Sequence, residues 1–267
     1  SQQVVVSNTS DTAEDTSDSE TQDNPDSSAN PGEEETPSSK ESSLTSETYS
    51  RRDAFPTALG QNEKPVGDDY FKDALFLGDS ISTGIPLYLQ NVLSDVPVIA
   101  EKGIGPHNAL TREIFPVDGV DKTMLEAAKA AENTRGEFGK IYILLGGNTL
   151  GIDKDYFLTS YKEFLQSVKD QFPNATIYVQ SMTPVTATVT NTYPNLGTGD
   201  INAKINEYNL GLMQLSSEVG VNYLDIASVF VDSEGRLPNE ASPSDGMHFG
   251  PDYYFKWYEY LKNHTAS

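Results

Sequence analysis

The sequence predicts an α/β fold in which a mostly parallel sheet lies between two layers of helices. Short apolar runs, each of strand length, alternate along the chain with longer segments whose apolar residues recur at helical spacing. Strands that alternate with helices form βαβ units, and right-handed crossovers leave few arrangements of such units. We therefore expect a three-layer α/β/α fold with a mostly parallel five-stranded sheet in the flavodoxin-like order 2-1-3-4-5.

Five segments have the pattern of a buried strand. The first is an apolar run that ends at Gly78, and the third is stopped by Gly146-Gly147. Continuous apolar runs suit parallel strands, because helices cover both faces of such a sheet. The strands are expected at residues 74–77, 96–100, 141–145, 176–182 and 221–226.

Helical segments separate these strands. In the longest of the early ones, Phe157, Tyr161 and Phe164 share one face, and Pro173 ends the pattern. Asp200 has the position of an N-cap for a helix that ends at Gly220. The helices are expected at residues 83–93, 121–133, 154–171 and 201–220, with a last one from 251 onward.

The N-terminal part differs in composition from the rest. The first fifty residues carry twelve acidic side chains and one basic side chain, Lys40, so they hold −11 of the formal net charge of −22. Such a segment cannot bury enough apolar surface to offset its loss of conformational entropy. We expect residues 1–65 to be a disordered, acidic, Ser/Thr-rich linker and residues 66–267 to form one folded domain.

Composition also excludes several classes of protein. The 267 residues include no cysteine, which excludes disulfides, thiolate metal sites and a cysteine nucleophile. The acidic surface argues against nucleic acid or anionic lipid as a partner. No apolar run reaches the length of a membrane span.

The composition of the linker bears on location. Long Ser/Thr-rich acidic linkers often follow the signal or anchor segment of bacterial surface proteins. We therefore expect a bacterial protein that is extracellular or tethered to the cell surface, with the leader removed from this chain. The alternative is a cytosolic protein with a flexible tail.

Four loops carry the candidate functional residues. Ligands of parallel sheets bind at the carboxyl ends of the strands. The loops after the first three strands hold Gly78-Asp79-Ser80, residues 101–105 and Gly146-Gly147-Asn148, and the loop before the last helix holds Asp245-Gly246-Met247-His248. Each alone is a common turn or cap, and an Asp-x-x-His pair without a third ligand is a poor metal site. Their conjunction at four loops of one sheet indicates a reaction site.

At these loops the sequence resembles the SGNH (GDSL-type) hydrolases, in particular their bacterial surface-associated members. Segment 75–80 is similar to the first family block, with Ser80 in the place of the nucleophile, and segment 145–148 is similar to the third. Asp245 and His248 have the places of the orienting acid and the general base. The resemblance covers about residues 70–262 and implies ester hydrolysis through an acyl-serine, with no metal or organic cofactor.

The resemblance also implies an oxyanion hole. Its donors are the backbone N–H of Ser80, the side-chain amide of Asn148 and a glycine N–H after the second strand. That glycine is Gly105 when counted from the strand end and Gly103 when matched by the local Gly-Ile pattern. The second block lacks the usual Asn. In the third block Thr149 replaces the usual Asp, so the loop that carries Asn148 must be braced in another way.

The chemistry of these residue types fits the assigned roles. A serine hydroxyl is a weak nucleophile and needs an adjacent base, here His248. Asp245 would fix the imidazole tautomer and stabilise the imidazolium. Asp79 is expected to be structural, with its carboxylate accepting N–H groups of the nucleophile loop.

The substrate is less defined by sequence. The family accepts acyl-CoA thioesters, lipids, aryl esters and O-acetylated sugars, but this chain has no long apolar insertion to cover a fatty acyl chain. His107 and Tyr193 are candidate substrate-binding residues, although the polar loop 183–199 around Tyr193 could equally be a solvated surface segment. We expect a monomer that removes O-acetyl or other short acyl groups from a cell-surface or extracellular polysaccharide. The alternatives are an O-acyltransferase that passes the acyl group to a glycan hydroxyl and a non-catalytic glycan-binding module.

Overall fold

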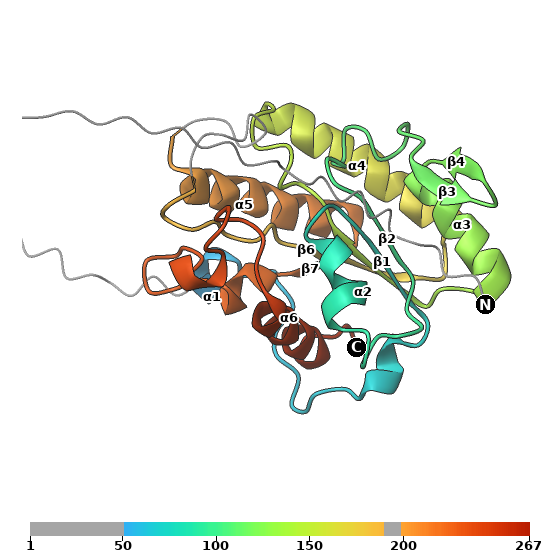
Figure 1. The fold of residues 1–267 in the computed structure, drawn as a ribbon, viewed down its shortest axis with the longest axis horizontal. Helices are drawn as coiled ribbons and strands as arrows, with labels where there is room; N and C mark the ends of the chain where they lie inside the picture. Colours follow the sequence, from blue (N-terminus) through green and yellow to red (C-terminus); the bar gives the residue numbers. More distant parts are fainter. Residues whose placement is uncertain (1–50, 190–198) are drawn as a thin grey trace, which may run out of the picture. The chain divides into compact units, whose positions relative to one another are not determined.

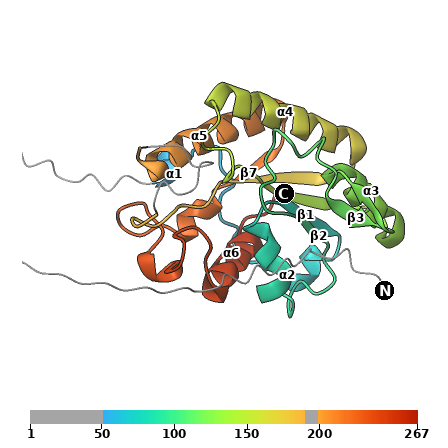
Figure 2. The same ribbon diagram turned by 45° about the horizontal axis from the view of Figure 1, so that its top comes forward.

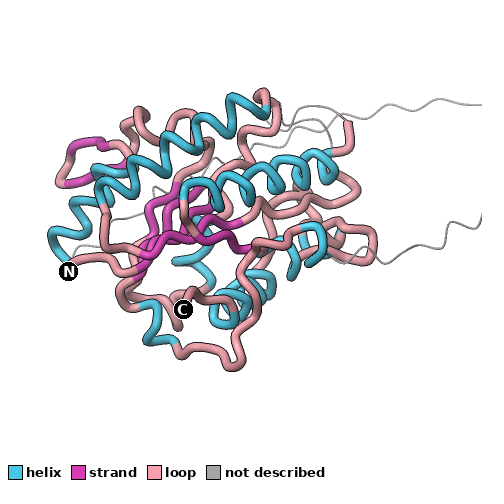
Figure 3. Tube along the Cα trace, turned by 180° about the vertical axis from the view of Figure 1, so that it is seen from behind, coloured by secondary structure: helices cyan, strands magenta, loops and turns pink. Residues whose placement is uncertain are grey.

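The computed structural model describes residues 51–189 and 199–267. Its main sheet is built from five parallel strands in the order β2-β1-β5-β6-β7 (Figures 1 and 3). The strands are β1 (Ala74–Gly78), β2 (Val98–Ala100), β5 (Lys140–Leu144), β6 (Thr176–Gln180) and β7 (Asn222–Leu224). When these five are numbered along the chain the order is 2-1-3-4-5, so the predicted fold is confirmed.

Alternate residues of the strands face two separate hydrophobic cores. Leu75 and Ile141 face the side covered by α3, α4 and α5, whereas Phe76 and Tyr142 face the side covered by α2 and α6 (Figure 2). The helices are α2 (Ile85–Tyr88), α3 (Met124–Arg135), α4 (Lys154–Gln171), α5 (Ile201–Val219) and α6 (Pro251–Asn263). Both faces of the sheet are therefore buried, which explains the apolar runs of the strands.

Side-chain caps fix where the longer helices begin. Asp200 accepts the N–H of Ala203 at the start of α5, and Gly220 ends that helix with a positive φ of 72°. Thr123 and Glu126 form a reciprocal capping box at the start of α3. The expected helices at 154–171, 201–220 and 251 onward agree with α4, α5 and α6. None of the helices within the described ranges is long and apolar enough to cross a membrane.

Two local elements differ from expectation. A two-stranded hairpin, β3 (Phe115–Val117) and β4 (Val120–Lys122), was not predicted and turns at Asp118-Gly119, where both residues have positive φ. The Asp-Gly pair is the signal for such a turn. The helix expected at 83–93 is only a 3-10 turn, Ser82–Gly84, followed by α2, because Leu89 leaves the helical backbone region.

The folded part begins before residue 66. Helix α1 (Arg51–Ala54) precedes Phe55, which is 2% exposed and stacks on Tyr223. The N–H of Leu59 donates to the carbonyl of Tyr223 at 2.9 Å. The folded domain therefore starts nearer the N-terminus than the boundary expected after residue 65, because residues 51–59 pack against its apolar surface. Residues 1–50 lie outside the described residues, and the linker there remains a prediction.

A buried ion pair joins this N-terminal stretch to the end of β7. Arg51 donates two hydrogen bonds to Asp225, at 2.6 and 2.7 Å, and a third to Asn206 at 3.2 Å. The two charged side chains are only 19% and 8% exposed. Loss of either partner would leave the other charge partly buried without compensation.

We predict that Arg51→Ala lowers the free energy of unfolding by about 3 kcal/mol, because it leaves the Asp225 carboxylate buried and unpaired. Urea unfolding of the wild type and the variant, compared at equal m-values, measures this. Lys72→Ala is the control, since its ion pair with Asp69 is exposed on both sides, and it should change stability by less than about 0.5 kcal/mol. Equal midpoints for Arg51→Ala and the wild type would contradict the assignment.

Candidate active site

The candidate residues converge at the carboxyl edge of the sheet. Ser80 follows β1, Asn148 follows β5, and Asp245 and His248 lie in the loop that precedes α6. Neighbouring strands β1 and β5 pair in register up to Gly78. The two loops that leave these strands are therefore adjacent, as the parallel sheet predicts.

Three side chains form a continuous hydrogen-bonded row. Ser80 Oγ lies 2.8 Å from His248 Nε2, and His248 Nδ1 lies 2.6 Å from Asp245 Oδ2. Ser80 and His248 are 168 positions apart in the sequence. The row gives the imidazole one nitrogen beside a hydroxyl and the other beside a carboxylate, which lets it accept the serine proton.

Asp245 also organises the loop that carries His248. Its Oδ1 accepts the N–H groups of Met247 and His248 at 2.8 and 2.9 Å and the hydroxyl of Ser242 at 3.0 Å. Partial burial raises the pKa of Asp245, but these backbone donors and the imidazole outweigh it and lower the pKa to about 2. The carboxylate is therefore ionised at neutral pH and favours the tautomer with hydrogen on Nδ1, which leaves Nε2 free to accept.

Gly246 is required by a close approach of the chain. Its φ is +77°, and an added Cβ would lie 2.5 Å from Thr186 Oγ1 and 3.1 Å from Val189 Cβ. The N–H of Thr186 donates to the carbonyl of Gly246 at 2.9 Å. Segment 185–189 thus packs directly on the loop that holds Asp245 and His248.

Asp79 braces the loop that carries Ser80, as the sequence indicated. Its side chain is fully buried, and Oδ1 accepts the N–H of Ile81 at 3.0 Å. Burial raises the pKa of Asp79 to about 6, against the lowering effect of backbone N–H groups that include those of Ile81 and Gly147. One carboxylate therefore contacts both the loop after β1 and the loop after β5.

The loop after β2 meets the loop after β5 through side-chain amides. Asn148 Nδ2 donates to the carbonyl of Ile104 at 3.2 Å. The N–H of Gly105 donates to Asn108 Oδ1 at 2.9 Å, and Asn108 Nδ2 donates to the carbonyl of Gly103 at 3.3 Å. Asn108 was not singled out from the sequence, because its bonds to Gly103 and Gly105 depend on how the turn at residues 106–111 folds.

Comparison with known families agrees with this geometry. The sequence model of the GDSL-like Lipase/Acylhydrolase family matches residues 76–254, more than half of the chain. The chain belongs to this family. No curated protein matches it in sequence.

Solved structures share the fold of this GDSL-like chain. A protein from Streptococcus pneumonia, provisionally designated a platelet activating factor, is 21% identical with a TM-score of 0.55, over 73% of this chain and 89% of that one. A GDSL-like lipase from Bacteroides thetaiotaomicron is 16% identical with a TM-score of 0.53, over 79% and 92%. A carbohydrate acetylesterase family member from Sinorhizobium meliloti is 18% identical with a TM-score of 0.50, over 71% and 95%. At these identities the likeness concerns the fold.

Thr149 supplies a brace where the family usually has an Asp. Its buried hydroxyl donates to the carbonyl of Gly146 at 2.6 Å, and its N–H donates to the same carbonyl at 2.9 Å. These two bonds close the turn that presents Asn148. This turn is therefore closed by a hydroxyl and a backbone N–H, while the Asp79 carboxylate contacts the same loop at Gly147.

Of the two candidate substrate-binding residues, only His107 lies among the described residues. His107 is half-buried beside Gly105, where an added Cβ would lie 3.0 Å from its Nδ1. That Nδ1 is buried and has no hydrogen-bond partner within the part of the chain that the structure describes, and burial lowers the pKa of His107. Tyr193 lies outside the described residues. Within 51–189 and 199–267, no group of three or more His, Cys, Asp or Glu residues is arranged to hold a metal ion.

We predict that Asp79 makes the fold less stable as pH rises from about 4 to 7. Because the folded-state pKa of about 6 lies above the ordinary value of 3.8, its contribution is fully present below pH 3.8 and is lost as pH rises through 6. Relative to Asp79→Asn, the wild type should lose up to about 3 kcal/mol over this range. Urea unfolding at a series of pH values measures the difference.

The exposed carboxylate of Asp69 provides the control for this titration. Asp69→Asn should follow the pH dependence of the wild type. A constant difference between the wild type and Asp79→Asn from pH 4 to 7 would contradict the effect assigned to burial of Asp79.

Proposed function

We propose that this GDSL-family protein is a serine-dependent ester hydrolase with Ser80 as nucleophile, His248 as general base and Asp245 as orienting acid. The observation that carries the proposal is the 2.8 Å contact between Ser80 Oγ and His248 Nε2, continued by the 2.6 Å contact from His248 Nδ1 to Asp245. Membership of an acylhydrolase family supports the same reaction class.

The reaction has two halves. Ser80 Oγ attacks the ester carbonyl while His248 Nε2 takes the hydroxyl proton, and Asp245 stabilises the resulting imidazolium. The tetrahedral intermediate expels the alcohol, which receives the proton from His248, and an acyl-serine remains. Water then attacks this acyl group with His248 again as base, which releases the acid and restores Ser80.

Three donors are proposed to bind the oxyanion: the Ser80 N–H, the Asn148 amide and the Gly105 N–H. Asn148 Nδ2 uses one hydrogen for the carbonyl of Ile104, and its second hydrogen remains for a ligand. Gly105 is favoured over Gly103 because an added Cβ at Gly105 would lie 2.5 Å from Thr149 Cγ2, beside the Asn148 turn. Near Gly103 the corresponding contact is only the end of the Arg112 side chain.

The proposed substrate is an O-acetylated or similarly short-acylated carbohydrate. A carbohydrate acetylesterase family member is among the structures that share the fold. Residues 1–50, with a net charge of −11 and few apolar side chains, fit a solvated tether. They support a proposed place for the enzyme at the cell surface or outside the cell, where such polymers occur.

We predict that Ser80→Ala abolishes hydrolysis of p-nitrophenyl acetate and of acetylated glycans, with a loss of at least about 10³-fold in kcat. For the wild type, kcat/KM should fall as the acyl chain lengthens from acetyl to octanoyl. Acetate release and nitrophenol absorbance measure these rates.

Each result can fail separately. Equal activity of Ser80→Ala and the wild type would refute the mechanism. A preference for octanoyl over acetyl esters would refute the short-acyl substrate but not the mechanism. Growth of an acylated product when an unacylated glycan is added would favour the transferase alternative.

We also predict that Asn108 competes with the oxyanion for the Gly105 N–H. Asn108→Asp should slow labelling of Ser80 by a fluorophosphonate by at least about tenfold, because a charged acceptor holds the N–H more strongly. Asn108→Ala, which frees the N–H, should label no more slowly than the wild type. The second-order labelling rate constant is the measurement, and faster labelling of Asn108→Asp than of the wild type would remove Gly105 from the oxyanion hole.

A further inference from the structure

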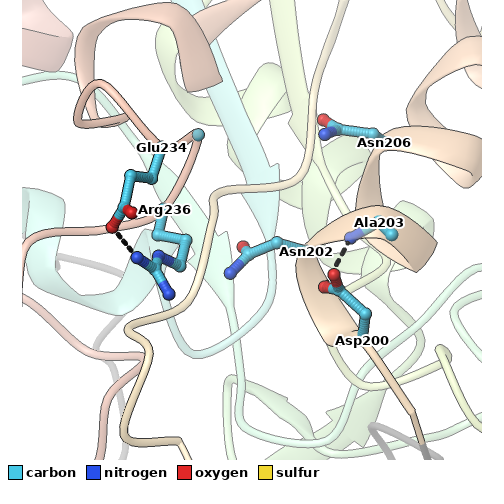
Figure 4. Close-up of a pocket in the computed structure, with 7 residues that line it drawn as sticks. Asp200, Asn202, Ala203, Asn206, Glu234 and Arg236 are labelled. Atoms are coloured by element: carbon cyan, nitrogen blue, oxygen red, sulfur yellow. Dashed lines mark hydrogen bonds and ion pairs between the residues drawn. The ribbon is translucent and has the colours of Figure 1, made fainter. Parts of the chain in front are cut away.

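Two polar cavities adjoin each other beyond the candidate active site. The first, of about 400 Å³, is lined mainly by Asp200, Asn202, Asn206, Glu234 and Arg236 (Figure 4). The second, of about 310 Å³, shares Glu234 and Arg236 with the first. The shared pair makes the two cavities parts of one polar surface.

The side chains in the first cavity come from two sides. Figure 4 shows Glu234 and Arg236, which form an ion pair, facing Asn202 and Asn206 at the start of α5. Among the described residues, the buried Nε of Arg236 has no hydrogen-bond partner. A buried donor without a partner carries a desolvation cost that a ligand oxygen can relieve.

One short segment separates these cavities from the catalytic loop. The side-chain amide of Asn202 accepts the N–H of Val185 and donates to the Val185 carbonyl, each at 2.9 Å. The N–H of Leu237 donates to the same carbonyl at 3.1 Å. The next residue, Thr186, donates to Gly246 between Asp245 and His248. Segment 185–189 therefore contacts a cavity wall through Val185 and the catalytic loop through Thr186.

The strand order shows how the cavities lie relative to Ser80. The loops that form the cavity walls follow β6 and β7, whereas Ser80 follows β1, and all these strands end at the same edge. β6 lies two places from β1 in the sheet, which is about 10 Å at the usual strand spacing. A chain that lies along this edge can place one group at Ser80 and a more distant group in the cavities.

The charges define the chemistry of that group. Two carboxylates, Asp200 and Glu234, and one guanidinium, Arg236, line the first cavity, so an anionic group meets a net negative site. The same carboxylates supply acceptors for hydroxyl groups, and the amide N–H groups of Asn202 and Asn206 that do not bond Val185 supply donors. No large apolar side chain lines the first cavity, so an acyl chain has little to bind there, whereas Leu237 and Pro238 are among the residues that line the second.

We propose that these cavities form a subsite for the neutral sugar units of a glycan chain whose acylated unit lies at Ser80. This subsite rests on the proposed esterase function and extends it to a polymeric substrate. Arg236 is its central donor, through the guanidinium edge not taken by Glu234.

The test compares a long and a short substrate. For the wild type and Arg236→Ala, kcat/KM is measured on an O-acetylated xylo-oligosaccharide hexamer and on p-nitrophenyl acetate. The ratio of the two values should fall about tenfold in Arg236→Ala, as expected for loss of hydrogen bonds from a charged donor. Arg135→Ala, at the opposite edge of the sheet, is the matched control and should keep the ratio of the wild type.

Binding is measured separately from catalysis. Calorimetric titration of unacetylated xylohexaose into Ser80→Ala and into Ser80→Ala/Arg236→Ala should show about tenfold weaker binding in the double variant. Glu234→Gln, which keeps the backbone and the shape of the side chain, serves as a second variant if Arg236→Ala has a lowered melting temperature, and it should lower the ratio in the same direction.

The outcomes separate the two proposals. Absence of esterase activity with intact, Arg236-dependent binding of xylohexaose would refute the proposed function and support the subsite. An active enzyme whose ratio and hexaose affinity are unchanged in Arg236→Ala and Glu234→Gln would overturn the subsite and leave the esterase standing. An active enzyme that binds no xylohexaose would also overturn it.

Discussion

The ionised carboxylate of Asp245 is the interaction on which the site geometry depends. It accepts two backbone N–H groups, a serine hydroxyl and the imidazole of His248. Through these bonds it fixes the shape of a loop, the orientation of a ring and the nitrogen that faces Ser80. The same donors keep its pKa near 2 despite partial burial. These hydrogen bonds therefore determine both the shape of the loop and the negative charge of Asp245.

A second carboxylate of the site is shifted in the opposite direction. Asp79 is fully buried and accepts fewer donors, so burial dominates and raises its pKa to about 6. It contacts the loop that carries Ser80 and the loop before Asn148. The site thus has one carboxylate that is stabilised as an anion and another whose ionisation is opposed by its surroundings. This contrast is typical of functional sites, where positioning takes precedence over stability.

Local signals in the sequence predicted much of this fold. Asp200 and Gly220 bound α5 as their chemistry suggests, and the apolar runs at β1 and β5 give strands because both faces are buried. The order of the sheet followed from βαβ connectivity. The hairpin that turns at Asp118-Gly119 also has a local signal, since an Asp-Gly pair favours this type of turn.

Other features depend on contacts that the sequence does not encode locally. The bond from Asn108 to Gly105 and the bond from Thr149 to Gly146 depend on how two loops turn. The packing of Phe55 on Tyr223 joins residues far apart in the chain, and composition alone placed Phe55 in the linker. The family resemblance indicated Asn148 and a glycine, but the acceptor of the Gly105 N–H, Asn108 Oδ1, depends on the folded shape of the loop.

The segment that follows α1 also covers the exposed edge of the sheet at β7. β7 is an edge strand: the carbonyl of Leu224 faces β6, where it accepts the N–H of Ser181, and that of Tyr223 faces outward. The N–H of Leu59 donates a hydrogen bond to this outward carbonyl, and the ring of Phe55 stacks on that of Tyr223. An uncovered edge of this kind is a template for pairing with a strand of another molecule. The N-terminal stretch therefore protects the sheet against self-association, and a truncation that removes it would expose an aggregation-prone edge.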